Sequence, residues 1–290
     1  MYLEGKKIMP PPWLAYPHIE RGSIGWRMGY GEGYMCRFCG WLNGLSQEER
    51  EEYRNLFPEP VTWSGWWEHG NTREELRRGG LRLPLWRPQG APQYTRAWLM
   101  REAAEGRWPD MRLFWKHHPA ADGRITENCL SQWWMQGFCY SVTKYCCMEQ
   151  FMIEHKAKLF EDEETRRQIM DSRQPHEIKE LGRKVRGFDQ ALWEEAKYSI
   201  VLNGNWRKFS QNRDLRDYLL STGDSVLAEA SPYDAIWGIR LPADAPEARD
   251  PFKWRGDNLL GFALMEVRDE LRRVTQNEGL CDWSVFDSEW

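Results

Sequence analysis

The stretch that most strongly determines the fold is MEQFMIEHKAKLF, residues 148–160. We predict a helix here, on which Glu149 and Lys156 are seven residues apart, two turns with an offset of about 20°. They share a face with Gln150 and Ile153, whose apolar atoms would partly desolvate the charges. A desolvated lysine has a lowered pKa and can attack a carbonyl-like carbon as the free amine. On spacing alone, however, two charges on a solvated helix face remain the favoured interpretation, since solvated charges are the default.

Outward from this stretch, helix signals continue toward the C-terminus. Pro175 is typical of a helix start, Gly223 follows a helix end, and NLLGFALMEVRDELRRV is a strongly periodic last helix. The intervening helices are expected over about 162–172, 175–186, 189–210 and 212–221. Gly204 can interrupt the third of them. MRLFWKHH, GFCYSVTKY and VLAEAS are strand-like, and PYDAIWGIRLPADAPEARDPFKW is a long loop.

Residues 1–110 have a different composition. They are rich in Pro, Gly and Trp, and stretches such as MPPPWLAYP and GWRMGYGEGY favour turns and irregular loops. Three short helices are expected, from Ser46 to about Phe57, after Asn71 in TREELRR, and after Thr95 in RAWLMREAAEG. LRLPLWRPQGAPQY, between the last two, is expected to be extended.

The bulk composition of the 290 residues excludes several classes of protein. With 41% hydrophobic residues, 29% charged residues and a mean hydropathy of -0.76, no run approaches the ~18 apolar residues that cross a bilayer. The N-terminus does not resemble a secretory signal, and seven scattered cysteines indicate reduced thiols, so we expect a cytoplasmic protein. The net charge of -4 implies that any contact with nucleic acid is local.

The 18 tryptophans and the cysteines offer few decisive signals. Trp rings can stack on nucleobases, but each is more often a core residue. Cys36 and Cys39 form a CxxC without a second ligand pair, and neither Cys146-Cys147 nor His117-His118 stands in a metal motif. No metal and no cofactor is therefore expected. Signatures of phosphoryl transfer, dinucleotide redox chemistry and esterases are lacking as well.

Two further segments carry candidate residues. In EASPYDAIWGI, Asp234 precedes Trp237 and Gly238. Asp234 could act in catalysis while Trp237 stacks on a base, or the segment could be a plain turn that Trp237 anchors; the two interpretations are equally good. Arg183, followed by Lys184, suits phosphate, although cations that complement a helix dipole are slightly favoured. Asn258 is a natural N-cap at a helix start that also suits an anion.

The order of the motifs resembles the NADAR family, also called YbiA-like proteins, over about residues 111–273. The matching strings are LFWKHHPAADGRITENCLSQWW, MEQFMIEHKAKLF, IKELGRKVRGFD, KFSQNRDLRDYLLSTGDSVLAEASPYDAIWGI and WRGDNLLGFALMEVRDEL. The resemblance implies a mainly helical α+β domain over 111–275, with the Trp-rich extension 1–110 packed on it and a short tail at 276–290. The extension looks like the leader of longer family members.

The resemblance also implies cleavage of a bond between ribose C1 and nitrogen. One family activity removes ADP-ribose from guanine in nucleic acid, reversing a DarT-type toxin; the other hydrolyses ribosylamino-pyrimidine phosphates of riboflavin biosynthesis. The long form looks closer to the first branch. A reader that binds ADP-ribose without cleavage is the non-enzymatic alternative, and the Trp-rich extension as a nucleic-acid module is a further one.

Mapped by motif, Lys156, Glu149 and Asp234 are the expected catalytic residues. The expected substrate-binding residues are Ser131, Trp133, Arg183, Trp237, Gly238, Asn258 and Trp115. In the resulting hypothesis Lys156 attacks ribose C1 to give an imine, Glu149 moves protons, and Asp234 positions a hydroxyl or water. If Lys156 is dispensable, paired carboxylates with an oxocarbenium-like transition state are preferred. One departure from the family is Met148, where Ser or Ala is usual; it affects local packing more than chemistry.

Overall fold

The computed structural model describes residues 2–68, 75–78, 81–84, 86 and 92–286. The chain forms two compact units. Unit 1 gathers the described residues of Met1–Arg73, Cys139–Thr143 and Glu270–Trp290, and unit 2 those of Glu74–Phe138 and Lys144–Asp269. The domain limits at 110 and 275 expected from the sequence, and the packing of the extension on the domain, stay predictions. No helix among the described residues is long and apolar enough to cross a membrane.

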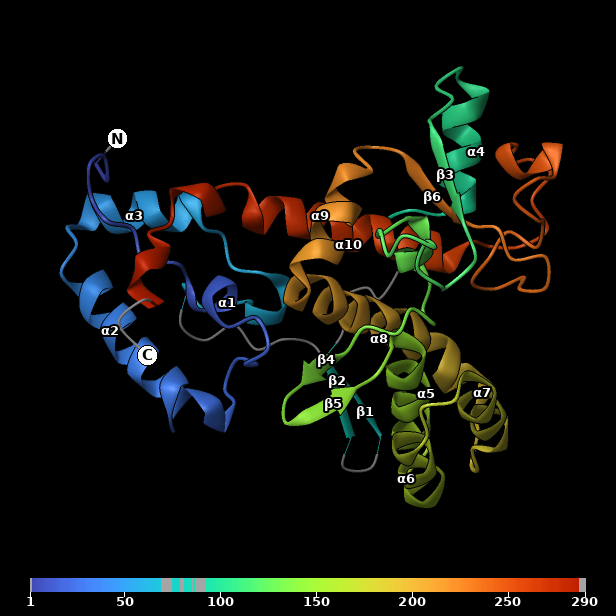
Figure 1. Cartoon of the computed structure of the whole chain (residues 1–290), viewed down its shortest axis with the longest axis horizontal. Coiled ribbons are helices and arrows are strands. Elements are labelled where there is room, and N and C mark those ends of the chain that lie inside the picture. Colours follow the sequence, from blue (N-terminus) through green and yellow to red (C-terminus); the bar gives the residue numbers. More distant parts are fainter. Residues whose placement is uncertain (1, 69–74, 79–80, 85, 87–91, 287–290) are drawn as a thin grey trace. The chain divides into compact units, whose positions relative to one another are not determined.

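Unit 2 is mainly helical. Its helices are α4 (Arg96–Ala104), α5 (Met148–Leu159), α6 (Glu163–Asp171), α7 (Pro175–Lys184), α8 (Gln190–Gln211), α9 (Arg213–Ser221) and most of α10 (Leu259–Thr275). Each begins and ends within about two residues of its predicted limits, because caps such as Asp162, Asp189 and Thr95 accept hydrogen bonds from the first-turn amides. Figure 1 shows α5, α6 and α7 side by side below α8.

Glycine permits close packing of α5 against its neighbours. A Cβ at Gly182 in α7 would lie 2.8 Å from Ile153, and one at Gly204 in α8 would overlap Met148. The suggested interruption of α8 at Gly204 is wrong, since the helix runs unbroken from Gln190 to Gln211. Gly204 serves contact between helices rather than a bend.

The strands form small two-stranded sheets. β3 (Met111–Phe114) pairs in parallel with β6 (Val226–Glu229), and β4 (Phe138–Tyr140) pairs with β5 (Thr143–Tyr145). β3 occupies the start of the predicted strand MRLFWKHH, and β6 the predicted VLAEAS. Their parallel arrangement places both carboxyl ends at one edge (Figure 1).

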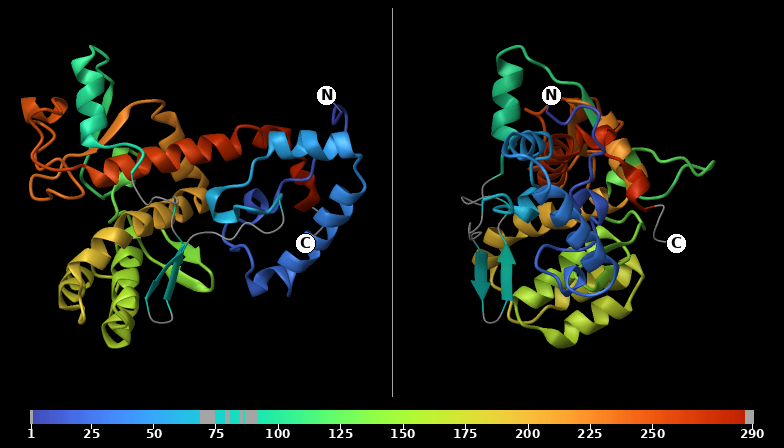
Figure 2. Two further views of the ribbon diagram at one scale, coloured as in Figure 1. Left: turned by 180° about the vertical axis from the view of Figure 1, so that it is seen from behind. Right: turned by 90° about the vertical axis from the view of Figure 1, so that its left-hand side faces the viewer.

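The helix predicted in TREELRR is wrong for its described part. Glu75–Arg78 forms β1, which pairs antiparallel with β2 (Leu81–Pro84) and is visible as a hairpin in Figure 2. Pairing with the extended segment that follows outweighs the helix preference of Glu, Leu and Arg. The proposed cap Asn71 lies outside the described residues, whereas the extended conformation expected from Leu81 is confirmed over β2.

Unit 1 contains α1 (Pro12–Ala15), α2 (Tyr30–Asn43) and α3 (Gln47–Leu56), with short 3-10 turns at Ile24–Trp26, Val61–Trp63, Glu278–Leu280 and Trp283–Phe286. Its core is aromatic. The centroid of the Trp13 ring lies 5.5 Å from that of Trp63 and 5.6 Å from that of Trp67. The irregular loop expected at GWRMGYGEGY is wrong from Tyr30 onward, where α2 begins. Burial of Tyr34 and Phe38 outweighs the low helix preference of the glycines.

Candidate active site

The candidate site begins at the edge where β3 and β6 end. Glu229 is the last residue of β6 and pairs with Phe114 of β3, and the next amide, Ala230, donates to Phe114 O at 2.7 Å. Trp115 therefore comes directly after the end of β3, next to the point where β6 ends at Glu229. The pairing gives a carboxylate and an aromatic ring a common edge.

The start of α5 is tied to a second segment. Glu149, in the first turn, donates its backbone N–H to Gln132 O at 2.9 Å. On either side of Gln132, the buried Ser131 accepts the amide of Trp133 through its Oγ, and Trp133 is half-buried. The buried Lys208 ammonium donates to Ser131 O at 2.8 Å. Ser131, Trp133 and Glu149 are thereby brought together.

Three carboxylates interact across these segments. Burial raises the pKa of Glu149 to about 7, with the Lys179 charge lowering it and the Asp234 charge raising it. Burial likewise raises the pKa of Glu229 to about 8, reinforced by the charges of Asp234 and Glu149. Among the described residues, the buried Glu229 Oε2 has no hydrogen-bond partner. Two carboxyls that are protonated or half-protonated at neutral pH suit proton transfer.

The loop that carries Asp234 is held by its own hydrogen bonds. Asp234 Oδ1 accepts the amides of Ile236 and Trp237 at 2.8 and 2.7 Å, and Ser231 Oγ accepts that of Asp234 at 3.3 Å. A Cβ at Gly238 would lie 2.8 Å from Glu229 O, so only glycine permits this approach to β6. The loop therefore fixes Asp234 beside Glu229 and leaves Trp237 half-buried.

Asn258 supports the same strand from the start of α10. It is fully buried with a φ of 56°, in the left-handed region that Asn tolerates better than most residues. Its Oδ1 accepts the amide of Glu229, and its Nδ2 donates to Leu227 O, both at 2.9 Å. The Asn258 amide group is thus engaged with the β6 backbone, and its predicted contact with substrate stays a prediction.

Helix α7 adds positive charge. The charge of the exposed Lys179 lowers the pKa of both Glu149 and Glu229. Arg183 is exposed four residues later on the same face. Lys179 is thus a cation that acts on the carboxylate cluster, and the predicted role of Arg183 in substrate binding stays a prediction.

Lys156 lies at the other end of α5. Its Nζ donates to Gly182 O at 2.8 Å and stands 4.6 Å from the ring centroid of Phe188 and 5.7 Å from that of Trp193. Burial lowers its pKa, as the desolvation argument expects. Seven residues of helix separate it from Glu149 by about 10 Å along the axis. Lys156 therefore has other neighbours than Glu149, whose pKa responds to Lys179 and Asp234, and its role as nucleophile stays a prediction.

Comparison with known proteins identifies the family. The model of the NADAR domain matches residues 113–272, more than half of the chain. The chain belongs to the NADAR family. The N-glycosidase R617 of Acanthamoeba polyphaga mimivirus is 41% identical over 158 residues, which cover 53% of this chain and 93% of R617. The riboflavin biosynthesis protein PYRR, chloroplastic, of Zea mays is 33% identical over 108 residues, which cover 36% of this chain and 16% of PYRR.

Among solved structures, the NMR structure of the E. coli protein YbiA is similar with a TM-score of 0.45 and 23% identity, covering 56% of this chain and 85% of YbiA. Further bacterial relatives are also named N-glycosidases. The predicted NADAR membership and mainly helical α+β fold are confirmed. So is the predicted class of enzyme, a hydrolase that acts on N-glycosyl compounds.

Within this NADAR domain, sequence reasoning missed Glu229 and Lys179. Glu229 ends the apolar run VLAE, and a carboxylate at the carboxyl end of a parallel strand is a recognisable signal once the pairing with β3 is known. Lys179 lies one turn before Arg183 on a helix that was predicted correctly. The buried Gln132 was missed too; its Oε1 has no hydrogen-bond partner among the described residues.

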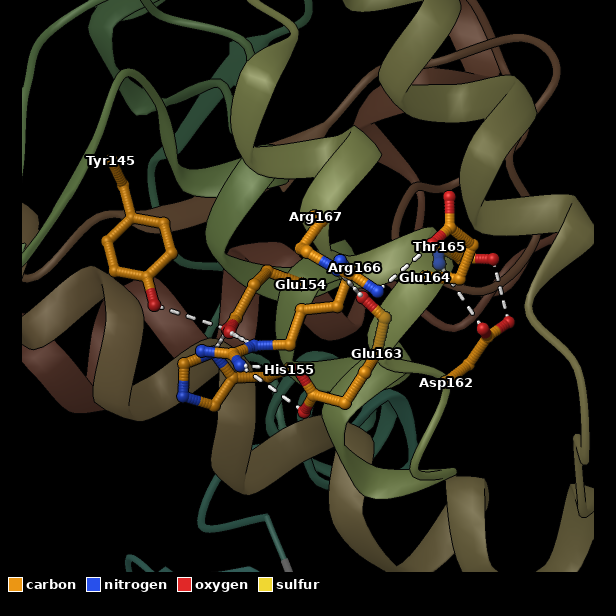
Figure 3. Close-up of polar contacts among 9 residues, drawn as sticks. All are labelled: Tyr145, Glu154, His155, Asp162, Glu163, Glu164, Thr165, Arg166 and Arg167. Carbon is orange, nitrogen blue, oxygen red and sulfur yellow. Dashed lines mark hydrogen bonds and ion pairs between the residues drawn. The ribbon is translucent and has the colours of Figure 1, made fainter.

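The NADAR domain contains a second polar cluster, around Glu154 (Figure 3). The buried Glu154 lies 2.8 Å from His155 Nδ1, 2.5 Å from Arg166 Nε and 3.2 Å from the Tyr145 hydroxyl. Although burial acts to raise it, the His155 and Arg166 contacts lower the pKa of Glu154 to about 2. The cluster joins α5 to α6 and β5. Among the described residues, no group of three or more His, Cys, Asp or Glu side chains is placed to hold a metal ion.

Proposed function

We propose that this chain removes ADP-ribose from ADP-ribosylated guanine by hydrolysing the bond between ribose C1 and the base nitrogen, and so reverses a DarT-type toxin. The observation that carries the proposal is the pair of carboxyls with raised pKa, Glu149 and Glu229, beside Asp234. Cleavage of a glycosidic bond needs one group that gives a proton and one that accepts a proton near neutral pH.

In the proposed reaction Glu229, with a pKa of about 8, gives its proton to the leaving nitrogen of the base. The C1–N bond breaks with its electron pair on nitrogen, and positive charge develops at C1 and the ring oxygen. Water then forms the new bond to C1, and Glu149, with a pKa of about 7, takes the proton that water loses. The products are unmodified guanine, still part of its nucleotide or strand, and ADP-ribose with a hydroxyl at C1. Asp234 stabilises the positive charge, and Trp133 and Trp237 enclose sugar and base.

The choice of substrate rests on phosphate. Lys179 and Arg183, two exposed cations on one face of α7, suit the diphosphate of ADP-ribose, Arg through its bidentate fork. They also suit the monophosphate of a ribosylamino-pyrimidine. Similarity to PYRR of Zea mays favours this second candidate substrate.

Mass-spectrometric product analysis separates the candidates. The enzyme is incubated with ADP-ribosylated guanine, free and in an oligonucleotide, and with the ribosylamino-pyrimidine phosphate. Release of ADP-ribose with unmodified guanine supports the proposal, and turnover of the pyrimidine compound alone supports the second candidate. Tight binding of ADP-ribose without turnover of either substrate would indicate a reader.

Lys156 as nucleophile keeps a separate test. Because its Nζ donates to Gly182 O, attack on C1 requires this hydrogen bond to be given up. Borohydride added during turnover reduces an imine to a stable amine, so a covalent route yields a protein–ribose adduct that Lys156→Ala abolishes. If Lys156→Ala keeps full activity and the wild type forms no adduct, the carboxylates alone carry out the reaction.

A further inference from the structure

Two exposed aromatic side chains meet at the carboxyl edge of β3 and β6. Trp115 follows β3 and is 42% exposed, and Tyr233, in the loop after β6, is 83% exposed. Their ring centroids are 6.2 Å apart with planes inclined at 57°. The rings do not stack face to face, so the pair presents aromatic surface to solvent.

This aromatic pair adjoins the carboxylate cluster. Tyr233 precedes Asp234, and its amide donates to Ser231 Oγ in the same turn. Trp115 follows Phe114, which is paired with Glu229. The next residue, Lys116, is exposed and adds a cation to this segment. By contrast, Trp133 and Trp237 are half-buried beside the carboxylates.

We infer that Trp115 and Tyr233 form a subsite that stacks the nucleobase next to the modified base in a single strand. The inference rests on the proposed function and specifies its substrate as an oligonucleotide. The leaving base has to reach the buried Glu229 carboxyl. Of the exposed pair, Trp115 lies one residue beyond Phe114, the strand partner of Glu229, and Tyr233 lies in the loop that follows Glu229. The adenine of ADP-ribose is separated from the scissile C1 by a ribose and a diphosphate, whereas a strand neighbour is attached directly to the modified nucleotide. Every base offers an aromatic face, so such a subsite recognises a strand with little preference for sequence.

The test compares one modified guanine in two contexts, as a mononucleotide and within a single-stranded oligonucleotide. Trp115→Ala and Tyr233→Ala should each lower the ratio of kcat/KM for the oligonucleotide to that for the mononucleotide by about 5- to 100-fold, chiefly through KM. Trp115→Phe and Tyr233→Phe keep a ring and should restore most of the ratio. An unchanged ratio in both alanine variants would overturn the inference, as would equal losses on both substrates, which indicate contact with the leaving base.

A matched control lies before the amino end of β3. Trp108 and Phe252 are 54% and 46% exposed, with centroids 6.4 Å apart and planes at 55°, so Trp108→Ala with Phe252→Ala removes a similar pair and should leave the ratio within twofold of the wild type. Fluorescence anisotropy with an unmodified single-stranded oligonucleotide adds an arm independent of turnover. Weaker binding by Tyr233→Ala supports the subsite even if the wild type cleaves no ADP-ribosylated guanine, and unchanged binding contradicts it. Failure of the wild type on both the mononucleotide and the oligonucleotide refutes the proposed reaction instead.

Discussion

At the scale of single residues, Glu229 combines a cost to stability with a use in chemistry. Its Oε2 is buried without a hydrogen-bond partner among the described residues, and its pKa is raised to about 8. The folded chain keeps this proton up to about pH 8, whereas an unperturbed Glu releases it near pH 4.5. Unfolding therefore releases a proton between these pH values, so stability falls as the pH rises through the window. Glu229 destabilises the fold most above pH 8.

Glu229→Gln keeps the shape of the side chain and removes its titration. We expect kcat to fall by about 10²- to 10⁴-fold, the usual contribution of a general acid. Because the neutral amide avoids a buried charge, the melting temperature at pH 9 should rise above that of the wild type, while the two proteins differ less at pH 5. Calorimetry at both pH values and a rate assay check this. A stable variant with wild-type kcat would exclude Glu229 as the acid.

The pH–rate profile of the wild type follows from the same two residues. The base Glu149 must be ionised, so kcat/KM should fall as the pH drops below about 7, and the acid Glu229 must be protonated, so it should fall as the pH rises above about 8. In Glu229→Gln the alkaline limb should disappear from the residual rate. A profile that is flat from pH 6 to 9 would contradict the assignment of both groups.

What the sequence predicts at this scale depends on whether a residue's partner is local. Glu149 and Lys156 lie on one helix, and their shared face follows from periodicity alone. The partners that determine their chemistry are not local: Asp234 and Glu229 come from segments about 80 residues away, and Gly182 from α7. Helical spacing therefore predicts the shared face correctly and cannot reveal that the two side chains have separate surroundings.

At the scale of elements, the Glu154 cluster joins α5, α6 and β5 without taking part in the proposed chemistry (Figure 3). Glu154→Gln removes the buried carboxylate that His155 and the partly exposed Arg166 contact, and should lower the free energy of unfolding by roughly 2–4 kcal/mol. Since the pKa of Glu154 is lowered to about 2, the contribution of its charge is present above about pH 4.5 and is lost as the pH falls toward 2. Urea titrations at pH 7 and pH 3 measure both effects.

Arg167→Gln, on α6 next to Arg166, is the matched control. Its partner Glu164 is 3.1 Å away, but both side chains are exposed, so the loss should stay below about 1 kcal/mol. Equal losses in Glu154→Gln and Arg167→Gln would mean that burial of the cluster contributes nothing.

Two glycine-to-alanine substitutions in helices should change stability in opposite directions. Gly204→Ala should destabilise by about 1–3 kcal/mol, because the added Cβ overlaps Met148 and lies 2.6 Å from Phe151. Gly40→Ala in α2 has open space around its Cβ and should stabilise by about 0.5–1 kcal/mol through helix preference. Thermal unfolding of both variants decides. Stabilisation by Gly204→Ala would show that α5 and α8 yield easily at this contact.

Element prediction succeeded or failed according to what ends each element. The capped helices after α5 were predicted nearly to the residue, because Asp162, Asp189 and Pro175 mark their starts locally. β1 was missed because Glu, Leu and Arg favour a helix and only pairing with β2 makes them a strand. The start of α2 at Tyr30 was missed because the aromatic burial that stabilises it is a tertiary effect.

At the scale of the whole molecule, the limit between the Trp-rich part and the NADAR domain has a physical consequence. Residues 86 and 92–104 contribute to unit 2: Trp86 is buried with its ring centroid 6.1 Å from that of Trp206, and the Tyr94 hydroxyl donates to Asp269 at 2.5 Å. Leu99 of α4 is fully buried as well. A boundary at residue 110, chosen from composition, removes these side chains from the domain that uses them.

Two truncated chains test this directly, one lacking residues 1–73 and one lacking residues 1–110. Both chains lack residues 1–73, which form unit 1 together with the C-terminal segment. Any difference in stability or activity between the two chains is therefore due to residues 74–110. Loss of the buried Trp86 and Leu99 should lower the melting temperature of the shorter chain by roughly 5 °C or more relative to the longer one. It should also reduce hydrolysis of a mononucleotide substrate, since α8 and α10 support Ser131 and Glu229 through Lys208 and Asn258. Equal melting temperatures and equal rates of hydrolysis in the two chains would support the boundary at residue 110.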